Sequence, residues 1–253
     1  MYRSCKEKDS YPGHKNIRFC GFFCNSNGIF IFRVYLKNMS WITFPEDRAR
    51  ELKKLVKKEE KLGVLKTPRI IDAFLSVDRA EFVPEDLKVF AYADEPQPLP
   101  GGQTISQPYT VAFMLELLSP KEDNRIMDVG YGSGWSSALL AYIVGEKGHV
   151  HALEIVPELC LFGKMNVEKF PELFSRIDFY CKSATDGLLK VGGFDGIISA
   201  AALESVPKAW REQLKTGGRI VYPLGDSLWL EVKQKDGSFE KKEYPGFVFV
   251  PYK

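Results

Sequence analysis

The stretch RIMDVGYGSGWSSALLAYIV, from Arg125 to Val144, decides the fold. It joins an apolar run to a helix-like run through Gly130, Gly132 and Gly134. Glycine loses more conformational freedom on folding than any other residue, so this spacing indicates a sharp backbone turn or a close approach. A strand that leads through a glycine loop into a helix is typical of ligand-binding α/β domains.

Apolar and helix-like segments alternate along the chain from this stretch onward. The strands that we predict are 126–129, 149–153, 177–180, 196–199 and 219–222, with helices at 136–144, 157–170 and 205–214. This alternation predicts an α/β fold with a doubly wound, mostly parallel sheet and helices on both faces. Nearer the C-terminus, Lys235, Asp236 and Gly237 separate two alternating segments, which predicts an antiparallel hairpin.

The segment before the glycine loop predicts helices. A capping box at Thr43 to Glu46 begins the first helix, Thr67-Pro68 opens the second, and 109–118 forms the third. We therefore expect one domain over 39–253, with an N-terminal helical segment at 43–118.

Residues 1–38 differ from the rest and predict a poorly defined N-terminal extension. A weak membrane or partner anchor is the alternative interpretation. No stretch there reaches the roughly 20 apolar residues of a membrane helix, and no convincing signal peptide is present. We expect no stable membrane association.

Charge and cysteine content narrow the class of protein. The chain has 35 Lys and Arg against 33 Asp and Glu, a balance that argues against nucleic acid as a partner. An odd count of five cysteines argues against a disulfide framework and favours the cytoplasm. Cys20 and Cys24 lack a second ligand pair, and His149 and His151 alternate along a predicted strand, which favours a neutral structural role. We expect a monomer without a metal.

Acidic residues follow three successive predicted strands. Asp128 ends the first strand and Glu154 follows the second, while Asp186 and Gly187 follow the third. The GxGxG spacing differs from the dinucleotide motif GxGxxG, and Asp128 would repel a pyrophosphate but accept from an ammonium group. Glu154 can bind two ribose hydroxyls, and Asp186 can meet an adenine amino group. This set favours S-adenosylmethionine over a nicotinamide cofactor.

Further motifs sharpen the assignment. VDRAEFVPED, AYADEP, GGQTISQPYTVAFMLELL, MDVGYGSGW, LKTGGRIVYPLG and FVFVPY occur in this order. From Val77 to Tyr252 the chain resembles protein-L-isoaspartate O-methyltransferases, and GQTISQP (Gly102–Pro108) is the most specific element. The resemblance implies a Rossmann-like methyltransferase domain. It also implies a repair reaction, in which S-adenosylmethionine methylates the free carboxylate of L-isoaspartyl residues in damaged proteins and peptides.

The resemblance also implies residue roles. Ser106 would hold the acceptor carboxylate as the catalytic residue. No general base is needed, because a carboxylate with a pKa near 4 is ionised at neutral pH. The residues implied for the cofactor pocket are Thr104, Ile105, Gln107, Asp128, Gly130, Tyr131, Gly132, Ser133, Gly134, Glu154, Ile155, Asp186 and Gly187.

The chain departs from the family pattern at several positions. Tyr131 replaces a Thr or Ser and predicts a bulkier group beside the cofactor. Pro100 replaces a glycine, Val248 stands where an arginine is usual, and AAALESVP at 200–207 lacks a central proline. Two alternatives therefore stay open: a divergent S-adenosylmethionine-dependent methyltransferase with another acceptor, and a non-catalytic cofactor-binding module.

Overall fold

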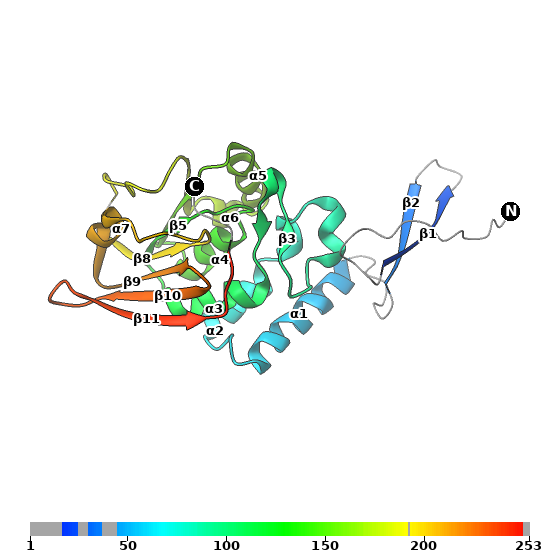
Figure 1. Ribbon diagram of the computed structural model, residues 1–253. Coiled ribbons are helices and arrows are strands. Elements are labelled where there is room, and N and C mark those ends of the chain that lie inside the picture. Colours follow the sequence, from blue (N-terminus) through cyan, green and yellow to red (C-terminus); the bar gives the residue numbers. More distant parts are fainter. Residues whose placement is uncertain (1–16, 25–29, 37–44, 192, 250–253) are drawn as a thin grey trace. The chain divides into compact units, whose positions relative to one another are not determined.

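The computed structural model describes residues 17–24, 30–36, 45–191 and 193–249 (Figure 1). The chain divides into two compact units, Met1–Asp47 and Arg48–Lys253. In the first unit, strands β1 (Ile17–Cys24) and β2 (Phe30–Leu36) pair antiparallel, although the sequence predicted no element there. The predicted cap at Thr43 lies outside the described residues, and α1 begins at Pro45.

A seven-stranded sheet in the order β11-β10-β9-β8-β5-β6-β7 forms the centre of the second unit. Five strands run parallel and correspond to the predicted ones: β5 (Arg125–Val129), β6 (His149–Glu154), β7 (Ile177–Cys181), β8 (Phe194–Ser199) and β9 (Leu214–Leu224). The antiparallel end is also confirmed, with β10 (Ser227–Lys233) between β9 and β11 (Phe239–Pro245).

The helices follow the prediction closely, with differences where proline intervenes. The helices are α1 (Pro45–Lys61), α2 (Pro68–Ser76), α3 (Pro108–Leu118), α4 (Trp135–Val144), α5 (Pro157–Glu168), α6 (Pro171–Phe174) and α7 (Lys208–Gln213). Pro171 opens the short α6, and Pro207 delays α7 to Lys208, because proline fixes φ and lacks the N–H of a helix interior. Between α2 and α3 lie the 3₁₀ helices η1 (Arg79–Phe82), η2 (Glu85–Phe90) and η3 (Pro100–Gly102), and the short strands β3 (Gln97–Pro98) and β4 (Thr104–Ile105).

Each face of the sheet packs against its own apolar cluster. On β5, Ile126 belongs to the larger cluster and Met127 to the smaller, since alternate residues of a strand point to opposite faces. Helix α4 is buried almost all round, with Trp135 and Leu139 each at most 1% exposed. On the other face, Trp210 of α7 is fully buried and its Nε1 donates to the Ala184 carbonyl over 2.7 Å. Helices therefore pack on both faces of the sheet and hold the strands from whose ends the functional loops extend.

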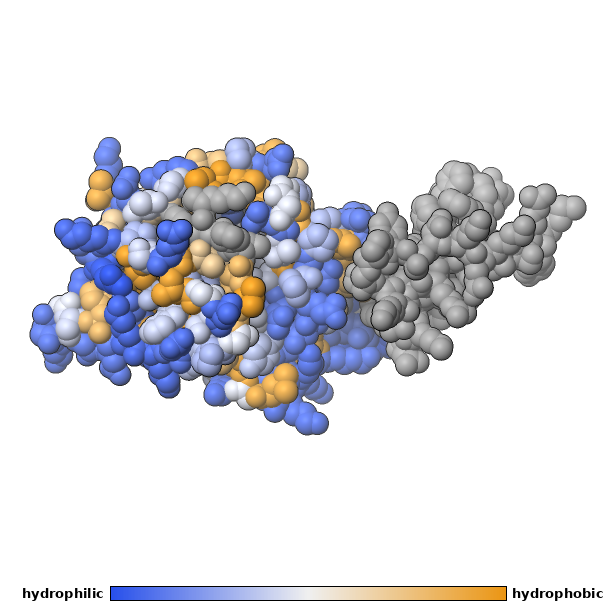
Figure 2. All heavy atoms as spheres, in the orientation of Figure 1, coloured by the Kyte–Doolittle hydropathy of each residue, from blue (hydrophilic) through white to orange (hydrophobic). Residues whose placement is uncertain are grey.

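The outer surface of the second unit is polar over the C-terminal hairpin. Figure 2 shows mostly hydrophilic residues over the hairpin of β10 and β11, where positions 240–243 of β11 are exposed. No helix of the described part of the chain is long and apolar enough to cross a membrane.

A disulfide corrects the expectation from the cysteine count. Cys160 of α5 and Cys181, the last residue of β7, are bonded with their Cα atoms 5.6 Å apart. The sequence spacing of 21 residues could not reveal this pairing, because it depends on α5 returning beside the end of β7. The argument against disulfides was therefore wrong for this pair.

Candidate active site

In the glycine loop after β5, Gly130, Gly132 and Gly134 all have positive φ. Gly130 has φ 74° and Gly134 has φ 86°, in the left-handed region that favours glycine. A Cβ atom on Gly134 would lie only 2.6 Å from the carbonyl oxygen of Gly163, so α4 begins directly against α5. At Gly130 the nearest atom would be 3.8 Å away, and there the backbone conformation alone calls for glycine.

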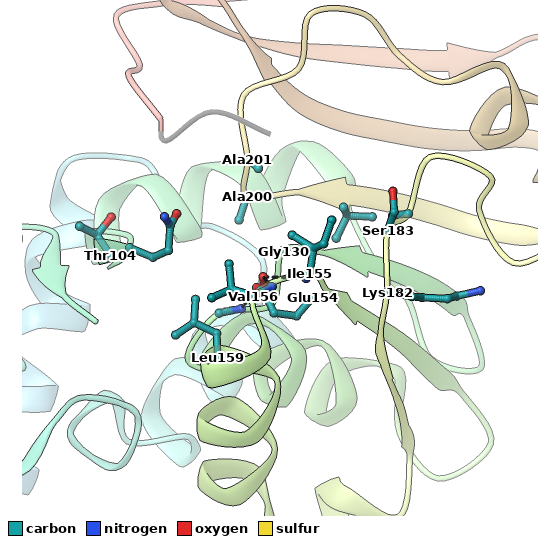
Figure 3. Close-up of a pocket in the computed structure, with 14 residues that line it drawn as sticks. Thr104, Gly130, Glu154, Ile155, Val156, Leu159, Lys182, Ser183, Ala200 and Ala201 are labelled. Carbon is teal, nitrogen blue, oxygen red and sulfur yellow. Dashed lines mark hydrogen bonds between the residues drawn. The ribbon is translucent and has the colours of Figure 1, made fainter. Parts of the chain in front are cut away.

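A cleft of about 620 Å³ opens at the carboxyl ends of the central strands (Figure 3). The strand order reverses at β5, which has β6 on one side and β8 on the other, and ligands of such sheets bind at that point. In Figure 3 the Glu154 side chain lies between Thr104 on one side and Lys182 on the other. The predicted residues that line this cleft are Thr104, Gly130, Gly132, Glu154 and Ile155.

Sequence reasoning missed the rest of the lining. The missed residues are Gln103, Val129, Val156, Leu159, Lys182, Ser183, Ala184, Ala200 and Ala201. Four of them lie in motifs that the sequence analysis quoted: Gln103 in GQTISQP, Val129 in MDVGYGSGW, and Ala200 and Ala201 in AAALESVP. The others enter the cleft through the folding of loops, which a pattern of residue types does not show.

Glu154 is held firmly at the wall of the cleft. The backbone N–H groups of Ile155 and Val156 donate to its Oε1 over 2.8 and 3.0 Å, and the N–H of Gly132 donates to Oε2 over 2.9 Å. The residue is only 6% exposed. Because a carboxylate accepts about four hydrogen bonds, it retains acceptor capacity toward the cleft.

Asp128 is a buried acid whose two carboxylate oxygens differ in their hydrogen bonding. The hydroxyls of Ser136 and Ser137 donate to its Oδ2 over 2.8 and 2.6 Å, whereas Oδ1 has no hydrogen-bond partner among the described residues. Burial raises the pKa of Asp128 to about 6, the two serine hydrogen bonds oppose this rise, and Glu154 adds to it. A buried acceptor without a donor is unfavourable by about 1–3 kcal/mol, so an ammonium group would fit this atom.

A second cleft of about 490 Å³ contains Ser106. Asp128, Ile105, Tyr131 and Ser133 also line it. It shares Thr104, Gly130, Gly132 and Ala200 with the first cleft. The Ser106 hydroxyl has no hydrogen-bond partner in the described part of the chain and remains available to a ligand. The two clefts therefore adjoin at the glycine loop.

Arg79 secures the loop that carries Ser106, and the sequence analysis missed it. Its guanidinium is fully buried and donates to the carbonyl oxygens of Ala91 over 2.7 Å, Glu95 over 3.2 Å and Ser106 over 3.1 Å. It also lies 5.4 Å from the ring centroid of Trp135 in α4. Burial lowers the pKa of Arg79 to about 10, so the group stays cationic at neutral pH.

Tyr131 is held by contacts with α5 and β7. Its hydroxyl donates to the carbonyl of Cys160 over 2.9 Å, and its ring meets Phe179 edge-on at 5.2 Å. The residue is 3% exposed. The hydroxyl end of the side chain is therefore accommodated between α5 and β7, while Tyr131 still lines the second cleft. A bulkier group beside the cofactor stays a prediction.

Some predicted residues lie outside both clefts. Asp186 is exposed in the turn after β7, and Gly187 packs so closely on Gln213 that a Cβ would lie 2.5 Å from its Oε1. Gln107 precedes α3 as its N-cap residue. Gly134 acts in the packing of α4 against α5. The adenine contact of Asp186 stays a prediction.

The glycine loop after the central strand, the acid after the next strand and the unpaired acceptor on Asp128 favour the class of S-adenosylmethionine-dependent methyltransferases. Within this class, the family model described as protein-L-isoaspartate(D-aspartate) O-methyltransferase matches residues 50–253. The chain belongs to this family.

Individual relatives agree with this assignment. The protein-L-isoaspartate O-methyltransferase of Methanopyrus kandleri is 40% identical over 212 residues, which cover 81% of this chain and 91% of the relative. That of Thermococcus onnurineus is 40% identical over 201 residues, covering 78% and 90%.

Solved structures give the same result. A Plasmodium falciparum chain, described as a protein-L-isoaspartate O-methyltransferase in complex with S-adenosyl-L-homocysteine, superposes with a TM-score of 0.72. It is 25% identical, and the match covers 79% of this chain and 97% of that one. These findings confirm the predicted family and fold, an enzymatic repair methylation, and S-adenosylmethionine as the methyl donor.

Proposed function

We propose that this enzyme methylates the free carboxylate of L-isoaspartyl residues in damaged proteins and peptides, and that Ser106 holds that carboxylate. The observation that carries the proposal is the adjoining pair of clefts, one with Glu154 and the other with Ser106, which meet at Gly130 and Gly132. Methyl transfer needs a donor and an acceptor in contact, and adjoining clefts provide this arrangement.

The donor belongs in the first cleft. Glu154 in that cleft would accept from ribose hydroxyls. The amino-acid ammonium group would reach past the glycine loop to the orphaned Oδ1 of Asp128, which lines the second cleft. When bound, S-adenosylmethionine supplies an electrophilic methyl group on a sulfonium. A cationic ligand between these two acids also offsets their mutual repulsion, which contributes to the raised pKa of Asp128.

The acceptor side needs orientation more than acid–base chemistry. An isoaspartyl carboxylate is already ionised at neutral pH, so the protein has only to aim one oxygen and exclude water. The unpaired Ser106 hydroxyl supplies a donor for the second oxygen. Arg79, through the Ser106 carbonyl, keeps that hydroxyl in place.

Substrate identity has one competing hypothesis, a divergent acceptor. The enzyme assignment removes the non-catalytic alternative. The hydrogen bond of the Tyr131 hydroxyl to the Cys160 carbonyl supports the view that this residue leaves the usual acceptor its space. Val248, at the position of the usual family arginine, is 84% exposed and brings no charge to a carboxylate. This observation favours weaker substrate binding as the form of any divergence.

A peptide pair tests the proposal. The enzyme is incubated with labelled S-adenosylmethionine and an isoaspartyl peptide, or with the same peptide containing normal aspartate. We expect methylation of the first only, and a rate at least about tenfold lower for Ser106→Ala, the loss expected for one transition-state hydrogen bond. Methylation of neither peptide, together with labelling of another acceptor, would establish the divergent hypothesis. A lower melting temperature with wild-type turnover in Ser106→Ala would reduce this serine to a structural role.

We propose further that residues 39–253 form one methyltransferase domain to which 1–38 are an extension. The family match over 50–253 and the compact unit Arg48–Lys253 support this division. A chain that begins at Met39 should keep its turnover and melting temperature. Loss of either would make the extension part of the domain.

We also propose a cytoplasmic monomer that does not bind nucleic acid. The near balance of 35 basic and 33 acidic residues supports the last point. The cysteine argument for a reducing compartment no longer contributes, because Cys160 and Cys181 are bonded. Gel filtration and cell fractionation test the first two points, and a dimer or a non-cytoplasmic fraction would contradict them.

A further inference from the structure

Three polar side chains that the methyl transfer does not use gather between β6 and the edge strand β7. His149 and His151 are two residues apart on β6 and therefore share one face of the sheet. Asp178 of β7 lies opposite His151 in the parallel register. This face also carries Leu153 and the smaller apolar cluster. The topology thus places two imidazoles and a carboxylate together on adjacent strands.

The nitrogen and oxygen atoms of this group lie nearly as close together as the ligands of a bound metal ion. Asp178 Oδ2 lies 3.0 Å from His149 Nε2 and 3.5 Å from His151 Nδ1, and all three atoms lie within 4.8 Å of one another. Zinc binds nitrogen and oxygen at about 2.0–2.2 Å, which puts tetrahedral ligand atoms about 3.3 Å apart. Small rotations of exposed side chains would close the remaining difference.

The three side chains differ in burial, so His151 is held in place while His149 and Asp178 can change rotamer. The His151 side chain is 6% exposed, and its ring packs edge-on against Phe194. Its Nδ1 also lies 3.3 Å from the Tyr180 hydroxyl, a contact that an ion bound to Nδ1 would replace. The side chains of His149 and Asp178 are 34% and 54% exposed, so they can move and an ion can enter from solvent.

We propose that His149, His151 and Asp178 bind a divalent transition-metal ion of the zinc class. Two imidazole nitrogens and a carboxylate oxygen suit zinc, cobalt, nickel or copper, whereas calcium and magnesium prefer all-oxygen sites. Three protein ligands with solvent access leave a further position for water. The sequence analysis favoured a neutral structural role for the two histidines. The sequence could not show that Asp178 lies beside them, because this depends on the pairing of β6 with β7.

The ion would act on the sheet and not on the methyl transfer. None of the three residues lines either cleft. His151 precedes Glu154 by three positions on β6, which is about 10 Å along a strand. The structural consequence is a link between β6 and β7, and β7 is the last strand of this sheet in the described part of the chain. The site would therefore stabilise the edge of the sheet beside the cofactor cleft.

Zinc titration of the full-length protein tests the proposal. Free thiols are first alkylated, because cysteine thiolates would compete for zinc. Calorimetry on the wild type should give one zinc per chain at this site. Asp178→Asn and His149→Ala should each weaken binding by at least about tenfold, since changes near a metal already cost 10–100-fold. Both changed residues are partly exposed, so we expect folded variants.

Matched measurements separate metal binding from a general effect. Asp236→Asn removes an exposed acid in the hairpin turn and should leave zinc affinity at the wild-type value. Zinc should raise the melting temperature of the wild type and of Asp236→Asn, but not of His149→Ala. S-adenosylmethionine affinity should be the same in all four proteins. No zinc binding by the wild type, or wild-type zinc affinity in either His149→Ala or Asp178→Asn, would overturn the proposal.

Discussion

The buried guanidinium of Arg79 donates a hydrogen bond of 3.1 Å to the main-chain carbonyl of Ser106. The same guanidinium holds the carbonyls of Ala91 and Glu95, so one side chain joins three segments of the chain. Among the residues that the structure describes, the Ser106 hydroxyl has no hydrogen-bond partner. The position of the catalytic candidate is therefore set by its backbone, through a residue 27 positions earlier.

Arg79→Lys should lower turnover more than it lowers cofactor affinity. An ammonium keeps the charge but cannot span three carbonyls as the planar guanidinium does. We expect about a tenfold loss in turnover with isoaspartyl peptide, the equivalent of about 1.4 kcal/mol, and a lower melting temperature. Calorimetry with S-adenosylmethionine should give a near-normal Kd. A destabilised variant with wild-type turnover would show that Arg79 supports only the fold.

Glu154→Gln should weaken cofactor binding. The amide keeps the shape of the side chain but loses the charge that strengthens hydrogen bonds from ribose hydroxyls. Such charge-assisted bonds contribute about 1.5–3 kcal/mol, so the Kd for S-adenosylmethionine should rise at least about tenfold. Glu158→Gln is the matched control, because Glu158 is exposed in the first turn of α5 and lines neither cleft. Equal affinities in the two variants would remove Glu154 from the cofactor site.

Glu59 should make stability depend on pH. Its side chain is fully buried, and neither carboxylate oxygen has a hydrogen-bond partner among the described residues. Burial raises the pKa of Glu59 to about 7, Asp94 adds to this rise, and Lys58 opposes it. The unfolded chain releases this proton near pH 4.3, whereas the folded protein keeps it until about pH 7.

The raised pKa in the folded state means that Glu59 makes the protein less stable as the pH rises. The contribution of Glu59 to stability is complete below about pH 4.3, and it is lost as the pH rises to about 7. Glu59→Gln cannot ionise, so its melting temperature should fall less than that of the wild type between about pH 5 and pH 8. If the melting temperatures of the two proteins changed equally between these pH values, Glu59 would not be the group responsible.

Removal of the Cys160–Cys181 disulfide should destabilise the second unit. A bond that closes a loop of 21 residues contributes about 3 kcal/mol through the unfolded state. We expect the double variant Cys160→Ser, Cys181→Ser to unfold at lower denaturant concentration, with a somewhat larger m-value because the unfolded chain without the bond is less compact. Mass spectrometry of the untreated protein checks that the bond is present. Identical denaturation midpoints would mean that the bond does not constrain the chain.

The sheet and the glycine loop were predictable because their signals are local. Periodicity identified β5 to β9, and the acids at Asp128 and Glu154 follow directly from strand ends. The disulfide, Arg79 and the Asp178 group depend on contacts between distant segments, which no local pattern carries. The orientation of Tyr131 belongs to the same class, because it depends on the space between α5 and β7.

The open edge of β11 has a consequence for how copies of this chain meet. Its residues Glu240, Lys241, Lys242 and Glu243 are consecutive and exposed, on the strand that ends the sheet within the described residues. A strand from a second molecule could extend the sheet there only by stripping water from several charged groups, and charged edges are a known protection against such pairing. An enzyme that handles damaged polypeptides, which expose unpaired backbone, is thereby guarded against aggregating with them along this edge.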